Sequence, residues 1–255
     1  MYPAALFRPA LVCAAAVVAM VAADSPVRAE SKEDNAFLNA FRDQESALSR
    51  AIEQSPKSLG LYSRRGDMRQ FLGKFEGAVA DYQKMIELDP SQDAPHWRLG
   101  IAYYFTGAFE KGAKQFEKYH AYDNRDRENG VWKFLCQTRA QDLATARKEL
   151  LVYTRFDREP FPGLYQMLAG EKSPEEVLRA ADAKEFEKQT QVRFFAKYYV
   201  GVYWSLTGKI DEGLKLVREA VELFTPETAG SGGPGYMWQV ARLHAREIAD
   251  RAAQK

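Results

Sequence analysis

A thiol and an imidazole are the side chains in this 255-residue sequence that suggest nucleophilic chemistry. Cys136 would act as a nucleophile if His120 or another neighbour lowered the pKa of its thiol. The position of Cys136 in a helical segment instead predicts a small buried residue that packs between helices. His96, His120 and His244 are far apart and lack the spacing of two ligands on one helix, so we expect surface or packing roles and no metal site.

A glycine-rich stretch near the C-terminus matches the dinucleotide-binding pattern G-x-G-x-x-G. Residues 230–235 read Gly-Ser-Gly-Gly-Pro-Gly, and a helical pattern follows them. A pyrophosphate site also requires a strand before the glycines, because the phosphate lies at the strand-to-helix turn of a βαβ unit. The preceding residues have a helical pattern, so we interpret residues 228–235 as a flexible linker.

Composition excludes several other classes of protein. Thirty-six basic and 35 acidic residues give a formal charge of +1, which provides no electrostatic drive toward nucleic acid or an anionic membrane surface. Two cysteines and three histidines are too few for a disulfide scaffold or a zinc cluster. Acidic pairs such as Glu175 and Glu176 are expected at the beginning of helices, where the helix dipole favours carboxylates. The sequence therefore predicts a non-catalytic protein without a cofactor.

The first 29 residues have the pattern of a cleavable export signal. Arg8 provides the positive region, residues 10–23 carry no charge, and residues 27–29 read Val-Arg-Ala. A permanent anchor needs about 20 apolar residues, whereas this run ends at Asp24. Cys13 lies at the beginning of the run, so it does not form a lipobox. We expect a periplasmic or secreted protein without a stable membrane anchor after signal cleavage.

An internal repeat organises the chain after this signal. Residues 59–92 and 93–126 align with a spacing of 34 and no gap. Small residues recur at the eighth place and aromatic residues at the twenty-fourth, as in Gly66 with Tyr82 and Gly100 with Phe116. The pattern resembles the tetratricopeptide repeat, in which small residues let two antiparallel helices touch closely. A further unit, residues 193–227, has a glycine at the eighth, fifteenth and twentieth places counted from Phe194.

The remaining segments also have helical periodicity, so the fold class expected is all-α. We expect a helical-hairpin superhelix, or α-solenoid, with a divergent central hairpin and a closing helix. Residues 30–58 should contain an N-terminal helix, and residues 236–255 the C-terminal one. Residues 127–192 should form a divergent hairpin, with its second helix extending through Leu150 and Tyr153, followed by a short helical insertion. The insertion should include a helix over residues 161–168 and another that begins at Ser173 with a capping box.

The order of these parts resembles the bacterial NlpI-like envelope tetratricopeptide family over roughly residues 45–225. The stretches that carry the likeness are residues 99–104, 132–135 and 198–204, which are mainly packing residues. The resemblance implies a dimeric lipoprotein adaptor that brings proteases and cell-wall hydrolases together. This chain departs from the family because it lacks a usable lipobox.

The family resemblance also implies that the first helix of each hairpin lines a concave groove. A peptide or a partner helix would bind there to aromatic and aliphatic side chains, and the predicted partner-binding residues are Phe71, Trp97, Ile101, Tyr104, Phe105 and Tyr198.

Three alternatives remain open for these residues and for the protein. The same stripe of side chains could be buried against the insertion or the C-terminal helix. The protein could be a self-assembling homodimer with a closed groove. Finally, an enzyme or a small-ligand receptor could lie in residues 127–192, and its signature would be a compact pocket with convergent polar groups.

Overall fold

The computed structural model describes residues 32–155 and 157–254. The predicted export signal at residues 1–29 lies outside this part of the chain. The described residues form helices and connections without a strand, which confirms the all-α fold class. No helix among them is both long enough and apolar enough to span a bilayer.

The first two hairpins have the close helix contacts that the repeat spacing predicts. Helices α2 (Leu59–Phe71) and α3 (Phe75–Leu88) form one, and α4 (Trp97–Phe105) and α5 (Phe109–Tyr122) form the next, with η1 (Pro90–Gln92) between them. A β-carbon on Gly66 would lie 2.5 Å from the ring of Tyr82, so only glycine fits there. Gly107 begins the α4–α5 turn with φ of 75°, a backbone conformation that favours glycine.

The third hairpin departs from the expected pattern in its second helix. Helix α6 (Arg127–Ala140) is a full first helix, but α7 (Leu143–Lys148) ends sooner than the sequence suggested. Leu150 and Tyr153 were expected in this helix and lie outside it, in the α7–α8 connection. The segment that follows α7 contains Val152, Tyr153 and Thr154, which favour extended backbone. Asp157 then accepts a hydrogen bond from the backbone N–H of Arg127 at 2.7 Å, which ties the connection to the beginning of α6.

The insertion consists of two short helices, as its sequence signals indicated. Helix α8 (Phe161–Ala169) ends at Gly170, which has φ of 85°. Helix α9 (Pro174–Ala181) begins with a capping box between Ser173 and Glu176. A 3₁₀ turn, η2 (Lys184–Phe186), leads to the last hairpin.

The last hairpin is longer than the first two, and the segment after it is partly helical. It contains α10 (Thr190–Leu206) and α11 (Ile210–Glu222). Residues 228–235 were expected to be a flexible linker, but Thr225 and Thr228 form a capping box that begins α12 (Pro226–Gly230). The irregular linker is therefore limited to residues 231–235.

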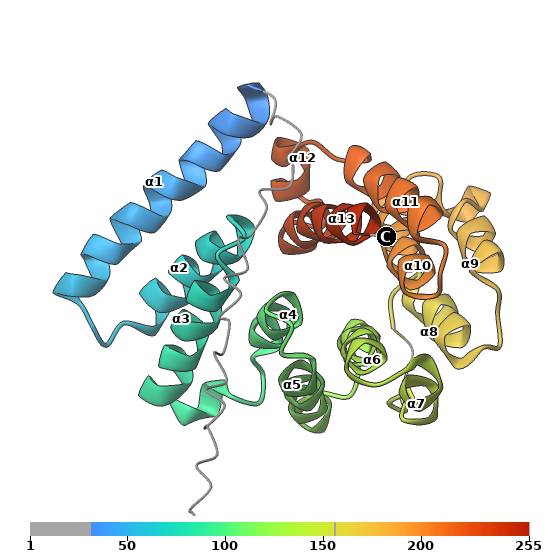
Figure 1. The fold of residues 1–255 in the computed structure, drawn as a ribbon, viewed down its shortest axis with the longest axis horizontal. Helices are drawn as coiled ribbons and strands as arrows, with labels where there is room; N and C mark the ends of the chain where they lie inside the picture. Colours follow the sequence, from blue (N-terminus) through green and yellow to red (C-terminus); the bar gives the residue numbers. More distant parts are fainter. Residues whose placement is uncertain (1–31, 156, 255) are drawn as a thin grey trace, which may run out of the picture.

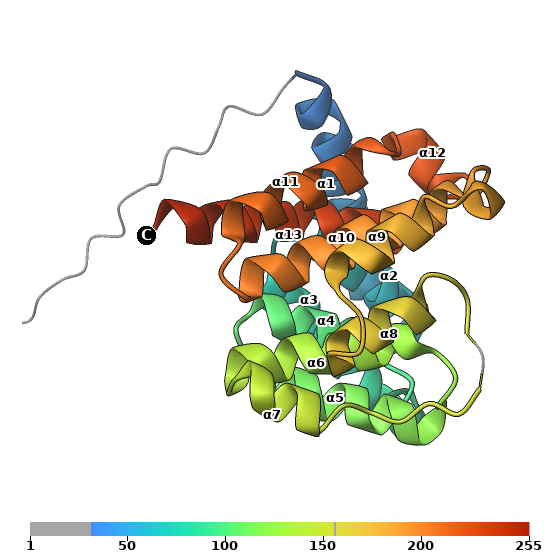
Figure 2. The same cartoon turned by 90° about the vertical axis from the view of Figure 1, so that its right-hand side faces the viewer.

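The hairpins curve around the C-terminal helix α13 (Tyr236–Ala253). Figure 1 shows α13 inside the arc that α2, α4, α6 and α10 make, while α5 and α7 lie on the outside. The long helix α1 (Lys32–Gln54) packs on α2, and its Phe37 ring lies 6.0 Å from the Trp238 ring of α13. Figure 2 shows the same arrangement from the side, with α10 and α11 beside α13. The first helix and the beginning of the last helix thus meet across the open side of the arc.

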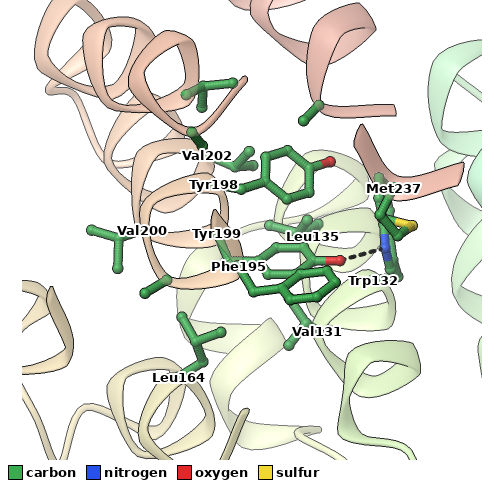
Figure 3. Packing of buried hydrophobic residues seen from close by; sticks show 14 of the residues in the cluster. Val131, Trp132, Leu135, Leu164, Phe195, Tyr198, Tyr199, Val200, Val202 and Met237 are labelled. Atoms are coloured by element: carbon green, nitrogen blue, oxygen red, sulfur yellow. Dashed lines mark hydrogen bonds between the residues drawn. The ribbon is translucent and has the colours of Figure 1, made fainter. Parts of the chain in front are cut away.

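The largest core cluster lies where α6, α8, α10 and α13 meet. Figure 3 shows Trp132 of α6 facing Tyr199 of α10, and its indole N–H donates to the Tyr199 hydroxyl at 3.1 Å. Leu164 of α8 and Met237 of α13 pack in the same cluster. This cluster joins the insertion and the closing helix to the second, third and last hairpins, whereas the first hairpin has a smaller cluster of its own around Tyr82.

Candidate functional site

The first helices of the hairpins form a concave wall, and its predicted binding residues face α13. The N-terminal end of α13 is held by aromatic contacts. The Tyr236 ring lies 5.0 Å from the Phe71 ring and 4.9 Å from the Trp97 ring. Arg242, two turns further along α13, donates to the backbone carbonyl of Phe71 at 2.7 Å.

A buried histidine holds the middle of α13 against the wall. His244 Nε2 lies 3.1 Å from the Tyr104 hydroxyl, and Nδ1 lies 3.0 Å from the Tyr198 hydroxyl. The Phe105 ring lies 5.4 Å from the same imidazole. Burial, together with the nearby Arg251 and Arg139, lowers the pKa of His244 to about 4, against the attraction of Glu247. The imidazole is therefore neutral at pH 7 and bridges two tyrosine hydroxyls from different hairpins.

An ion pair follows one turn later on α13. Arg139 of α6 donates to the Glu247 carboxylate at 2.7 Å and lies 3.4 Å from the Tyr104 hydroxyl. Arg251 then donates to the Ser205 hydroxyl of α10 at 2.9 Å. The polar side chains of α13 thus have partners on α6 and α10.

These contacts bury much of the predicted site. Ile101, Tyr104 and Tyr198 are 1%, 2% and 0% exposed, whereas Trp97 and Phe105 are half-buried. The expectation of an open groove is wrong for Ile101, Tyr104 and Tyr198, and also for the buried Phe71, because α13 covers the wall. These residues are instead buried against the C-terminal helix, which was one of the alternatives left open by the sequence.

Sequence reasoning missed the part of the site that α13 contributes. His244 was expected to have a surface or packing role. Burial of the stripe against the C-terminal helix was one of the open alternatives, but the residues of that helix that make the contacts were not identified. Tyr236 and His244 are eight residues apart, close to two helical turns, which places them on one face of the helix. That spacing indicates a packing face on the helix, but it does not identify the surface against which this face packs.

The two residues considered for catalysis, Cys136 and His120, have packing roles in the structure. Cys136 is completely buried, and burial raises the pKa of its thiol, which opposes formation of a reactive thiolate. A β-carbon on Gly112 would lie 2.7 Å from the sulfur, so Cys136 occupies a tight helix contact. The His120 ring packs 4.7 Å from the Tyr153 ring. Across residues 32–155 and 157–254, no three His, Cys, Asp or Glu side chains gather in a way that could hold a metal ion.

Comparison with known proteins agrees with the repeat seen in the fold. The TPR repeat family model matches residues 71–107. Together with the helical hairpins and their close glycine contacts, this match confirms the prediction that the chain contains tetratricopeptide repeats.

The chain is also similar to individual proteins of this kind. It is 26% identical over 180 residues to a lipoprotein NlpI homolog from Haemophilus influenzae, which covers 69% of this chain and 55% of that protein. It is 29% identical over 121 residues to an SGT1 homolog from Bos taurus, covering 46% of this chain and 36% of that protein. The chain thus spans between about one third and about half of the length of these two relatives.

Among solved structures, yeast Tom70 aligns with 89% of this chain and 48% of its own, at 18% identity and a TM-score of 0.36.

Proposed function

We propose that this protein is an exported, non-catalytic scaffold that binds other proteins. The observation that carries the proposal is the tandem array of tetratricopeptide hairpins, since proteins built from this repeat bind protein partners. The likeness to the lipoprotein NlpI homolog supports a role in the cell envelope. By the same likeness, the partners we propose are envelope proteases or cell-wall hydrolases.

The proposed contact surface is the concave wall, entered from the edge that α13 leaves accessible. Trp97 and Phe105 keep part of their surface exposed, and Arg98 lies over the Trp97 ring at 5.1 Å. An aromatic ring beside a guanidinium is a frequent anchor in protein interfaces. Only a partner that displaces α13 would reach the other predicted binding residues, which are Phe71, Ile101, Tyr104 and Tyr198.

Affinity capture with the chain from residue 30 onward tests this proposal. The native protein is immobilised beside Trp97→Ala and a control, Val152→Ala, which removes an exposed apolar side chain outside the wall. We expect the native protein and the control to retain a protease or a hydrolase from envelope extract, and Trp97→Ala to lose it. Loss of one aromatic anchor should weaken binding by about 2 kcal/mol. Purified partner, mixed with each purified form of this protein, must then bind the native protein and the control more tightly than Trp97→Ala.

Two results would contradict this proposal. Equal retention by all three proteins would place the contact on another surface of the molecule. Absence of any retained partner, with all three proteins folded, would contradict the scaffold role itself.

The burial of the wall under α13 favours a second candidate, a self-assembling homodimer with a closed groove. In that case the outer helices, which α13 does not cover, would make the contact. Sedimentation equilibrium over a hundredfold range of concentration separates the two functions. A mass that doubles with concentration, without a captured partner, would support the homodimer.

A further inference from the structure

A hollow of about 430 Å³ lies where the α7–α8 connection, the beginning of α10 and the linker before α13 come together. This volume falls within the range of small-ligand pockets, which is about 300–1,000 Å³. Parts of the chain that are distant in sequence contribute to its wall, including Arg158, Lys188 and Phe224. Part of its lining belongs to residues 127–192, for which the sequence analysis kept a small-ligand receptor as an alternative.

The inner part of the hollow is apolar. Val192 and Phe195 of α10 are 4% and 6% exposed, and Phe224 at the end of the last hairpin is half-buried. Phe195 is fixed in place because its ring packs 5.3 Å from the Phe161 ring. An apolar group could therefore rest on aromatic surface that is already ordered, with little loss of conformational entropy.

Two cations lie at the rim of the hollow. The Arg158 guanidinium lies 4.3 Å from the centre of the Phe161 ring and 5.8 Å from that of the Phe195 ring. It forms ion pairs with Asp126, Asp157 and Glu128. Its side chain is nevertheless 47% exposed. Lys188 is exposed and has no ion pair within the described residues.

Lys188 is the cation that can attract an anion at the rim. Arg158 is neutralised by its three carboxylate partners, and Glu159 is the acidic residue in the lining. Burial raises the pKa of Glu159, so the environment opposes its charge. The α10 helix begins in this wall without a side-chain cap, which adds a positive helix end to Lys188.

We infer that this hollow binds a small carboxylic acid with an apolar body. The body lies against Phe195 and Phe224, and the carboxylate points to Lys188 and the exposed edge of Arg158. An aryl or branched alkyl carboxylic acid has such an apolar body and a carboxylate, and it is small enough for the hollow. This site is separate from the concave wall, so it does not depend on the proposed scaffold function.

Titration with 3-phenylpropionate tests the inference on the chain from residue 30 onward. Saturation-transfer NMR measures ligand binding, and amide shifts of the ¹⁵N-labelled protein locate it. The neutral analogue 3-phenylpropionamide has the same body without the charge, and acetate has the charge without the body. We expect the acid to bind with shifts centred on residues 188–195, and the amide and acetate to bind at least about fivefold more weakly.

A pair of lysine variants identifies the anion contact. Lys188→Gln removes the unpaired cation, and Lys184→Gln removes an exposed lysine four residues earlier that does not line the hollow. We expect Lys188→Gln to weaken binding of the acid about fivefold and Lys184→Gln to leave it unchanged. A third variant, Phe224→Leu, should weaken the acid and the amide equally, because it changes only the apolar wall.

Three results would overturn the inference. The first is absence of saturation by 3-phenylpropionate and by a branched alkyl acid up to about 20 mM, where even a weak ligand occupies its site. The second is equal affinity of the acid and the amide. The third is an identical effect of the two lysine substitutions.

Discussion

At the scale of single residues, the helix contacts depend on positions where no β-carbon fits. Gly100 is such a position, because a β-carbon there would lie 2.6 Å from the ring of the fully buried Phe116. Gly60 of α2 is the opposite case, because a β-carbon there would meet no neighbouring side chain or loop within 4 Å. The same substitution should therefore have opposite effects at the two sites.

We expect Gly100→Ala to lower the free energy of unfolding by about 2 kcal/mol, because the added methyl group overpacks the α4–α5 contact. Gly60→Ala should raise it by about 0.5–1 kcal/mol, because alanine favours a helix over glycine. Urea denaturation of both variants measures the difference. Equal stability of the two variants would contradict the close packing assigned to Gly100.

The buried histidines predict how stability depends on pH. Burial lowers the pKa of both His96 and His244 to about 4, whereas the unfolded value is about 6.5. The unfolded state therefore binds more protons between these values, and each histidine removes up to about 3 kcal/mol of stability as the pH falls from 6.5 to 4. Glu128 acts in the opposite direction, because burial raises its pKa to about 7 and stability falls as the pH rises from 4.5 to 7.

Among these three groups, the effects of Glu128 and of one histidine on the free energy of unfolding nearly cancel. Their combined contribution at low pH is therefore a loss close to that of one histidine. His244→Gln should consequently give a nearly flat stability profile between pH 7 and pH 5, at lower overall stability. Urea denaturation at several pH values checks this expectation, and an unchanged slope in the variant would contradict it.

At the scale of elements, α13 and α4 support each other through Tyr104. The Tyr104 ring lies 5.4 Å from the Phe109 and Trp132 rings and 5.1 Å from the His244 ring. A residue predicted to bind a partner thus has most of its contacts inside the protein. Substitutions in the wall consequently change folding as well as any binding.

We expect Tyr104→Ala to destabilise the protein by about 3–5 kcal/mol, because it leaves a cavity between α4 and α13. Tyr104→Phe should cost about 1–2 kcal/mol, because it keeps the ring and leaves the His244 nitrogen without its partner. Guanidinium denaturation measures both values. If Tyr104→Ala were as stable as the native protein, α13 would not be packed on this wall.

At the scale of the whole molecule, α13 and α1 close the open side of the arc. Phe37 of α1 packs beside Trp238 of α13, and the Trp238 indole N–H donates to the Val221 carbonyl at 3.0 Å. The closing helix is therefore part of the core that it shares with α10 and α11. The α7–α8 connection is the contrasting region, because residues 151–155 lie outside any helix and Val152 is 75% exposed.

Hydrogen exchange should distinguish these two regions. We expect amides in the middle of α13 to exchange as slowly as those of α10, because both helices open only with the core. Amides of residues 151–155 should exchange many times faster. Fast exchange throughout α13, with slow exchange in α10, would show that the wall opens in solution and would favour partner access to Tyr104.

Sequence alone was sufficient for the first two hairpins and the last one, but not for the second helix of the third. The spacing of 34 residues and the small residues at its eighth and twentieth places depend on contacts within one hairpin, as in Gly66 with Tyr82. Local signals were equally clear in the insertion, where Gly170 and Ser173 mark helix ends by their own backbone chemistry.

The position of α13 was decided only by the tertiary structure. An apolar helix face can pack on the end of a repeat, in a groove or against another copy, and its periodicity is the same in each case. The choice follows from contacts between distant residues, such as His244 with Tyr104, which are 140 positions apart. Such contacts form only after the hairpins have stacked and curved, because the curvature brings the two tyrosine hydroxyls and Arg139 to one side of the arc. The hairpins are therefore encoded locally, whereas the state of the groove is a property of the folded whole.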